Sequence, residues 1–142
     1  MTVDIMEMVK AAKPSIAVIG LGGAGCNIIT WIAKKGMVGG RIIAANTDIN
    51  HLARMTRADK LILMGKKLCN GYGCGGNPVM GALAATEDLA EIKADLKDVN
   101  LLFLVAGLGG GTGSGAIPVI AEAAKELGIL TIACVTIPFR ME

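Results

Sequence analysis

The feature of the sequence that most restricts its fold is a glycine-rich segment directly after an apolar run. Five of the seven residues from Gly109 to Gly115 are glycine, and the run before them, Leu101–Ala106, is entirely apolar. Each glycine costs roughly 0.5–1 kcal/mol in chain entropy, so this density needs a ligand or a close backbone approach to offset it. An uninterrupted apolar run is typical of a strand buried on both faces of a parallel sheet. We therefore expect an α/β fold in which this loop leaves the end of a strand.

Short apolar runs alternate with longer helical patterns along the rest of the chain. The predicted strands are 15–20, 41–46, 60–64, 100–106 and 129–137, and the predicted helices are 25–35, 50–57, 78–97 and 114–127. Asn77 as a cap and Pro78 at the first helical position predict the start of the third helix. This alternation favours a doubly wound, Rossmann-like parallel sheet of order 3-2-1-4-5 with helices on both faces. We expect residues 1–13 to form a separate arm or short helix, and residues 14–142 to form one domain.

A second glycine-rich segment follows the first predicted strand. Gly20, Gly22 and Gly25 fit the pattern Gly-x-Gly-x-x-Gly at the start of a helix, where free N–H groups and the helix dipole favour a phosphate. Asp48 follows the second strand, near the place where dehydrogenases have the acid that holds a ribose. One interpretation is therefore the NAD-binding domain of an oxidoreductase. It leaves the second glycine loop unexplained, and the chain has no room for a substrate domain.

Both glycine loops are expected to open into one crevice. In the order 3-2-1-4-5 the first and fourth strands are neighbours, and ligands bind where the strand order reverses. Neither loop contains Lys or Arg, and the chain has no Gly-x-x-x-x-Gly-Lys-Ser/Thr motif. The charge of a phosphate would then be met by backbone N–H groups, two helix N-termini and the hydroxyls of Thr112 and Ser114. The sequence predicts a nucleotide site without a lysine.

These segments resemble, in the same order, the nucleotide loops of the tubulin/FtsZ family of GTPases, and the resemblance covers Ile16 to Glu142. Gly109–Gly115 resembles the family's signature loop. The Gly71–Pro78 segment and the Val-Thr-Ile-Pro-Phe run ending at Phe139 are closer to the FtsZ branch, and to its archaeal members, than to tubulin. Cys74 departs from that branch, which typically has Ala. The resemblance implies a cytoskeletal GTPase that binds GTP or GDP with Mg²⁺ and polymerises for cell division, with other division proteins as further partners.

The resemblance also implies a set of nucleotide contacts. Asp48 is expected near the terminal phosphate, reaching Mg²⁺ through water, so that no residue is a direct metal ligand. The loop around Cys74 is expected to sense the γ-phosphate, and Glu142 to contact the ribose. The expected nucleotide-binding residues are Gly22, Gly23, Ala24, Gly25, Asn27, Asn46, Asp48, Gly73, Cys74, Gly75, Gly76, Asn77, Gly107, Gly109, Gly110, Gly111, Thr112, Gly113, Ser114, Pro138 and Glu142.

No catalytic residue is expected within these 142 residues. In the resembling family the nucleotide lies between successive subunits and the water-activating acids come from the neighbour. The resemblance places those acids, the central helix with the base contacts and the C-terminal domain beyond Glu142. We therefore expect the chain alone to bind nucleotide with negligible turnover, and the preference for guanine rests on the resemblance alone. A non-catalytic nucleotide-sensing or assembly protein of the same superfamily is a third interpretation.

Composition excludes several other classes of function. A net charge of +2 with scattered basic residues, and only 3% aromatic residues, argue against a nucleic-acid partner. The most apolar stretch, 128–139, is far shorter than the ~20 residues of a membrane-spanning helix, and we expect a cytoplasmic protein. The four cysteines form no Cys-x-x-Cys pair and are expected to be reduced thiols. With His51 as the single histidine, we expect no zinc site.

Overall fold

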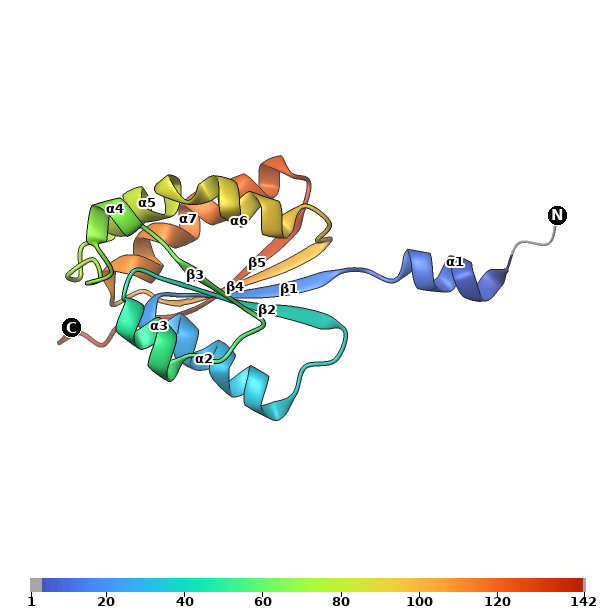
Figure 1. Ribbon diagram of the computed structural model, residues 1–142, viewed down its shortest axis with the longest axis horizontal. Helices are drawn as coiled ribbons and strands as arrows, with labels where there is room; N and C mark the ends of the chain where they lie inside the picture. The colour runs from blue at the N-terminus through green and yellow to red at the C-terminus, as the bar shows by residue number, and fades with distance from the viewer. Residues whose placement is uncertain (1–3, 142) are drawn as a thin grey trace.

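A five-stranded parallel sheet forms the centre of the molecule (Figure 1), in a computed structural model that describes residues 4–141. The strand order is β3-β2-β1-β4-β5, which confirms the predicted doubly wound fold. The strands are β1 (Ile16–Leu21), β2 (Gly40–Asn46), β3 (Lys60–Leu63), β4 (Leu101–Gly107) and β5 (Leu130–Thr136). Each lies within one residue of its predicted bounds, because short apolar runs separated by polar or glycine-rich segments mark strands clearly whether or not they are buried.

Helices cover both faces of this sheet, as predicted (Figure 1). The face with α2 (Gly22–Lys35) and α3 (Ile49–Met55) lies opposite the face with α5 (Pro78–Glu87), α6 (Leu89–Leu96) and α7 (Gly111–Glu126). A single turn, α4 (Lys66–Cys69), precedes α5, and α1 (Ile5–Ala12) extends away from the sheet with no buried residue. The division into an arm and one domain stays a prediction. No helix within residues 4–141 is long and apolar enough to cross a bilayer.

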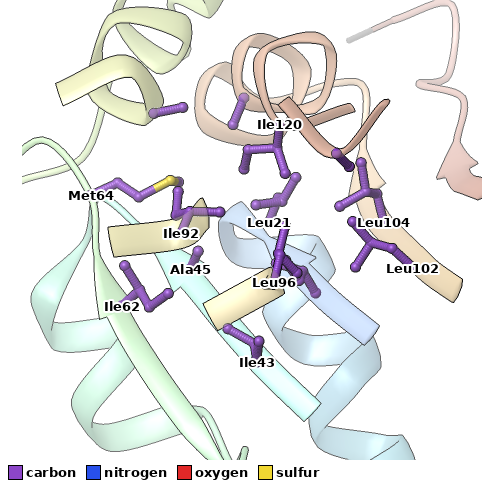
Figure 2. Packing of buried hydrophobic residues seen from close by; sticks show 14 of the residues in the cluster. Leu21, Ile43, Ala45, Ile62, Met64, Ile92, Leu96, Leu102, Leu104 and Ile120 are labelled. Atoms are coloured by element: carbon purple, nitrogen blue, oxygen red, sulfur yellow. The ribbon is translucent and has the colours of Figure 1, made fainter. Parts of the chain in front are cut away.

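The larger part of the core lies between the sheet and the α5–α7 layer (Figure 2). Leu21, Leu102 and Leu104 of the sheet are buried against Leu96 of α6 and Ile120 of α7. A smaller apolar layer, which includes Val18, Ile29 and Ile42, lies under α2 on the other face. Successive residues of β1 therefore alternate between two buried layers, which explains why the strand is apolar throughout.

The prediction of one helix over residues 78–97 is wrong, because the helix is interrupted at Asp88, between α5 and α6. Asp88 has φ −108° and ψ 17°, and its Oδ2 accepts a hydrogen bond of 2.6 Å from the N–H of Gly65. The carboxylate of Glu87 accepts hydrogen bonds from the N–H groups of Lys67 and Leu68. These two acids bind the backbone of α4, which the sequence analysis missed, and this contact interrupts the longer helix.

β5 departs from the expectation that the apolar strands are buried on both faces. It lies at the edge of the sheet, paired only with β4, and most of its residues are exposed. Leu130 is 66% exposed and Ile132 is 41% exposed. Composition alone did not distinguish this edge strand from the central ones.

Candidate functional site

The candidate site lies where β1 and β4 end side by side, with Leu21 paired to Ala106. α2 begins at Gly22 directly after β1, and α7 begins at Gly111 after the loop that follows β4. A cavity of about 600 Å³ opens between them, within the size range of small-molecule sites. Its lining residues are Leu21, Gly22, Gly23, Ala24, Gly107, Gly109, Gly110, Gly111, Thr112, Gly113, Thr136, Ile137, Pro138 and Phe139. The two glycine loops therefore share one crevice, as predicted.

Both helices that begin at this cavity lack a side-chain cap. The N-cap residues are Leu21 for α2 and Gly110 for α7, and neither provides a side-chain hydrogen bond. By contrast, Asp48 caps α3 and Asn77 caps α5 through their side-chain oxygens. The first N–H groups of a helix have no partner within the helix, so an uncapped N-terminus is suited to an anion. Each such end stabilises an anion by typically ~0.3–1 kcal/mol.

None of the lining residues carries a charge. A phosphate in this cavity would therefore be held by backbone N–H groups and helix dipoles, as the lack of Lys and Arg in both loops predicts. Such donors are fixed by the fold and lose no side-chain entropy on binding. The arrangement suits a polyphosphate better than a neutral ligand.

The glycines of the first loop are required for two different reasons, helix packing and open space at the cavity. A Cβ atom on Gly20 would lie 2.5 Å from the carbonyl oxygen of Gly25, and one on Gly25 would lie 2.3 Å from that of Val105. These two glycines allow α2 to pack closely on the sheet. Gly22 has φ +71°, and around Gly23 the nearest atom to a Cβ is 3.9 Å away. Gly23 therefore leaves open space on the cavity side of the turn, whereas Gly25 is buried and lines no part of the cavity.

The glycines of the second loop also fall into two groups, those needed for helix packing and one that faces the cavity. The expected start of the last helix at 114 is too late, because α7 already begins at Gly111. A Cβ on Gly111 would lie 2.5 Å from the backbone nitrogen of Asn77, and one on Gly115 would lie 2.0 Å from the carbonyl oxygen of Pro78. These glycines therefore bring the backbones of α7 and α5 into contact. Gly110 has no atom within 4 Å of a Cβ position and lines the cavity.

The hydroxyl groups expected at the site are already hydrogen-bonded. Ser114 Oγ donates to the carbonyl oxygen of Leu108 at 2.9 Å. Thr112 Oγ1 lies 2.7 Å from Thr47 Oγ1, and either hydroxyl can be the donor. Because Ser114 has its only hydroxyl proton engaged, Thr112 is the better placed of the two to donate to a ligand in the cavity.

Asn46 and Asp48 lie beside the site without lining the cavity. Asn46 Oδ1 accepts hydrogen bonds from the N–H groups of Thr47 and Asp48, and its Nδ2 lies 3.4 Å from His51 Nδ1. Asp48 Oδ1 accepts from the N–H groups of Asn50 and His51. These contacts hold the end of β2 and the start of α3 in place.

The segment 70–77, hereafter the 70–77 loop, lies on the α5 side of α7 and also stays outside the cavity lining. Cys69 Sγ, at its base, is 3.8 Å from Cys74 Sγ. Burial, with the adjacent Cys74 thiol as a lesser cause, raises the pKa of Cys69 to about 11. Burial likewise raises the pKa of Cys26, in α2, to about 12. No group of three or more His, Cys, Asp or Glu side chains able to hold a metal ion occurs between residues 4 and 141.

The structure thus brings about half of the predicted site residues to one cavity. The cavity-lining residues among them are Gly22, Gly23, Ala24, Gly107, Gly109, Gly110, Gly111, Thr112, Gly113 and Pro138. Those elsewhere are Gly25, Asn27, Asn46, Asp48, Gly73, Cys74, Gly75, Gly76, Asn77 and Ser114. Glu142 lies outside the described residues. The sequence analysis missed Leu21, Thr136, Ile137 and Phe139, although the predicted order already placed the end of the fifth strand beside the fourth.

Known proteins resemble this chain in sequence and in structure. A family model for the GTPase domain of the tubulin/FtsZ family matches residues 15–142. The cell division protein FtsZ 1 of Methanocaldococcus jannaschii is 50% identical over 139 residues, which are 98% of this chain and 38% of that protein. The structure described as an empty FtsZ dimer from M. jannaschii superposes with a TM-score of 0.91 at 50% identity, covering 96% of this chain and 40% of the other. CetZ2 from Haloferax volcanii, described as a GTPγS-bound protofilament, gives 0.77 at 28% identity, covering 90% and 41%.

Proposed function

The chain belongs to the tubulin/FtsZ family, in its GTPase domain, and from this premise we propose that it binds GTP and GDP in the cavity between β1 and β4. The observation that carries the proposal is the meeting of two uncapped helix N-termini at one uncharged cavity. The chain spans 38% of the length of the M. jannaschii relative. The activity and partners of a whole protein therefore belong to the proposal as well.

In this proposal the phosphates lie against the N–H groups of the turn at Gly110–Gly113 and of the first turn of α2. The nucleoside extends along the segment after β5, where Pro138 and Phe139 line the cavity. The two uncapped helix N-termini support this placement, because their backbone N–H groups can meet the phosphate charge where the lining has no lysine. Contacts of Asn27, of the 70–77 loop and of Glu142 with nucleotide remain predictions.

Mg²⁺ is part of the proposal, and the residues present suit a water-mediated ion. Protein-bound Mg²⁺ usually keeps several waters and takes only one or two carboxylates besides the substrate phosphates. Asp48 is half-buried beside the cavity, and its capping bonds use only Oδ1. Asp48 would hold the ion through water, and the ion would neutralise phosphate charge.

We propose further that the chain alone turns over GTP negligibly, because none of the residues that line the cavity is an acid. Asp48 caps α3, and Asp88 and Glu87 bind the backbone of α4. A general base must reach the attacking water within about 2.6–3.2 Å or through one further water. Assembly into division filaments, with acids supplied by a neighbouring subunit, and a cytoplasmic location follow the family and the relative named as a cell division protein.

Titration calorimetry on nucleotide-stripped protein tests the proposal, with GTP, GDP, ATP and NAD each titrated with and without Mg²⁺. We expect GTP and GDP to bind more tightly than ATP or NAD, with 1:1 stoichiometry. Tighter binding of NAD would instead favour the oxidoreductase interpretation, which the family assignment does not support. Equal affinity for ATP and GTP would reject the guanine preference and leave a general nucleotide site.

A further inference from the structure

Two cysteine thiols are in contact beside the candidate site, and the proposed function does not use their thiol chemistry. Cys69 Sγ and Cys74 Sγ are 3.8 Å apart. A disulfide requires about 2.05 Å between the sulfurs, so the pair must approach by less than the diameter of one atom. Cys69 is 7% exposed at the end of α4, whereas Cys74 is half-buried in the 70–77 loop. The approach therefore falls mainly to Cys74.

The 70–77 loop has the backbone freedom that this movement needs. Gly71, Gly73, Gly75 and Gly76 all have positive φ, and Cβ positions on Gly75 and Gly76 meet no atom within 4 Å. Such glycines change conformation at low steric cost. Cys69 is the buried residue of α4, whereas Cys74 lies in a glycine-rich loop whose backbone can adjust.

The pair is also connected to the cavity by a chain of hydrogen bonds. Cys74 Sγ donates to Thr47 Oγ1 at 3.5 Å, and Thr47 Oγ1 lies 2.7 Å from Thr112 Oγ1. While the thiol donates to Thr47, Thr47 can give its own proton to Thr112, whose proton is then free to point into the cavity. Thr112 lines that cavity. A thiol proton on Cys74 therefore favours the orientation in which Thr112 is a donor to an anion.

We propose that Cys69 and Cys74 form a reversible disulfide, and that its formation weakens nucleotide binding by withdrawing the Thr112 hydroxyl as a donor. In the oxidised form Cys74 has no proton to give and its sulfur has moved towards α4. Thr47 then loses a donor, and Thr112 gives its proton to Thr47 instead of to the ligand. The effect on nucleotide rests on the proposed function, whereas the disulfide itself does not.

The chemistry balances with a low-molecular-weight disulfide as the oxidant. The more accessible Cys74 thiolate attacks one sulfur of the oxidant, giving a mixed disulfide and releasing one thiol. The Cys69 thiolate then attacks Cys74 Sγ and displaces the second thiol. Two cysteine thiols and one disulfide become one protein disulfide and two small thiols, so the two protons and two electrons lost by the protein reduce the oxidant.

The test is oxidation of the 142-residue chain with oxidised glutathione, followed by peptide mapping without reduction. Trypsin leaves both cysteines in the peptide 68–93, which should lose two hydrogen atoms and regain them with dithiothreitol. Calorimetry should then show GDP and GTP affinity falling about tenfold on oxidation, the effect of one lost hydrogen bond to a charged group. Hydrogen exchange in the 70–77 loop should slow as the crosslink forms.

Matched variants separate the possible outcomes. Cys69→Ala should abolish the loss of two hydrogen atoms from peptide 68–93, and Cys74→Ala, which has no thiol proton to lose, should make nucleotide affinity insensitive to oxidant. Cys134→Ala, which removes the exposed cysteine of β5, should behave as wild type. A product crosslinked only between molecules through Cys134 would overturn the disulfide, and an intramolecular disulfide with unchanged affinity would overturn the coupling. If the reduced protein binds neither nucleotide, the proposed function fails instead, and peptide mapping and hydrogen exchange still decide whether the pair forms and rigidifies the loop.

Discussion

At the scale of single residues, neighbouring glycines in the loop after β4 have different surroundings. Gly110 faces open space, while Gly111 touches the backbone of Asn77. The sequence analysis predicted that this glycine run belongs to a binding site, since the density of glycine needs an explanation. It did not separate ligand contact from helix packing, because both require the same absent side chain and only the position of α5 distinguishes them.

A valine in place of Gly110 is therefore expected to block the phosphates without disturbing the fold. Its φ of −100° suits any residue, and no atom lies within 4 Å of the added Cβ. Calorimetry should show at least tenfold weaker binding of GDP, ~1.4 kcal/mol, with an unchanged melting temperature. Gly111→Val is the contrasting variant, since its Cβ would lie 2.5 Å from a backbone nitrogen and overpacking of this kind costs typically ~1–3 kcal/mol of stability. Wild-type affinity in Gly110→Val would mean that phosphates bind elsewhere.

Cys26 gives a prediction about stability at high pH. Burial raises the pKa of its thiol from 9.0 to about 12 in the folded chain, so the folded state keeps a proton that the unfolded state releases. Stability is then fully present below about pH 9 and falls as the pH rises towards about 12, by up to ~1.4 kcal/mol per pH unit.

Urea unfolding between about pH 8 and 10.5 measures this dependence on pH. The free energy of unfolding of Cys26→Ala should fall less steeply with pH than that of wild type. Equal slopes for wild type and Cys26→Ala would show that the thiol titrates normally.

At the scale of elements, the strands were predictable and the helix boundaries were less so. Apolar runs identify buried strands, and Asn77 with Pro78 marks the start of α5 by local chemistry alone. The break at Asp88 depends on the N–H of Gly65, which is distant in sequence, so no local pattern reveals it. Asp95 is a similar case: its side chain is 10% exposed and pairs with Arg41 and Lys60, which holds α6 against β2 and β3.

The cap of α5 can be tested separately from nucleotide binding. Asn77 Oδ1 accepts the N–H of Val79 at 2.9 Å, and removing such a cap typically costs ~0.5–2 kcal/mol. Asn77→Ala should lower the free energy of unfolding in urea by this amount without nucleotide present, and Asn77→Asp should restore most of it. A fully stable Asn77→Ala variant would show that the contacts of α5 with α7 hold the helix start without the cap.

At the scale of the whole molecule, the prominent feature is the exposed β5 edge. A second cavity of about 380 Å³ lies between α2 and β5, lined mainly by apolar side chains such as Ile28, Phe103 and Val135. The fifth strand could not be told from the others by its sequence, because an apolar run does not reveal which element packs over it. The fold class and the crevice between β1 and β4 do not depend on what packs over β5, which is why both could be predicted.

Turnover by the isolated chain is the prediction that belongs to this scale. Phosphate release from GTP with Mg²⁺ should remain at the background rate at every protein concentration, because none of the residues that line the cavity is an acid. A Gly110→Val sample provides the background. Release that rises steeply with protein concentration would show that copies of this chain complete a catalytic interface together.

The order of the strands also determines when the sheet can be completed during synthesis. β1 pairs with β2, where Ile16 is opposite Gly40, but its other edge pairs with β4, where Ile16 is opposite Leu101. At about 5–20 residues per second, β2 is available to β1 several seconds before β4 leaves the ribosome. During that interval the central strand presents an open, uncharged edge of the kind that pairs with other chains. The first glycine turn is also complete while α7 does not yet exist, so a nascent chain has only half of its crevice until the last third of the sequence has been made.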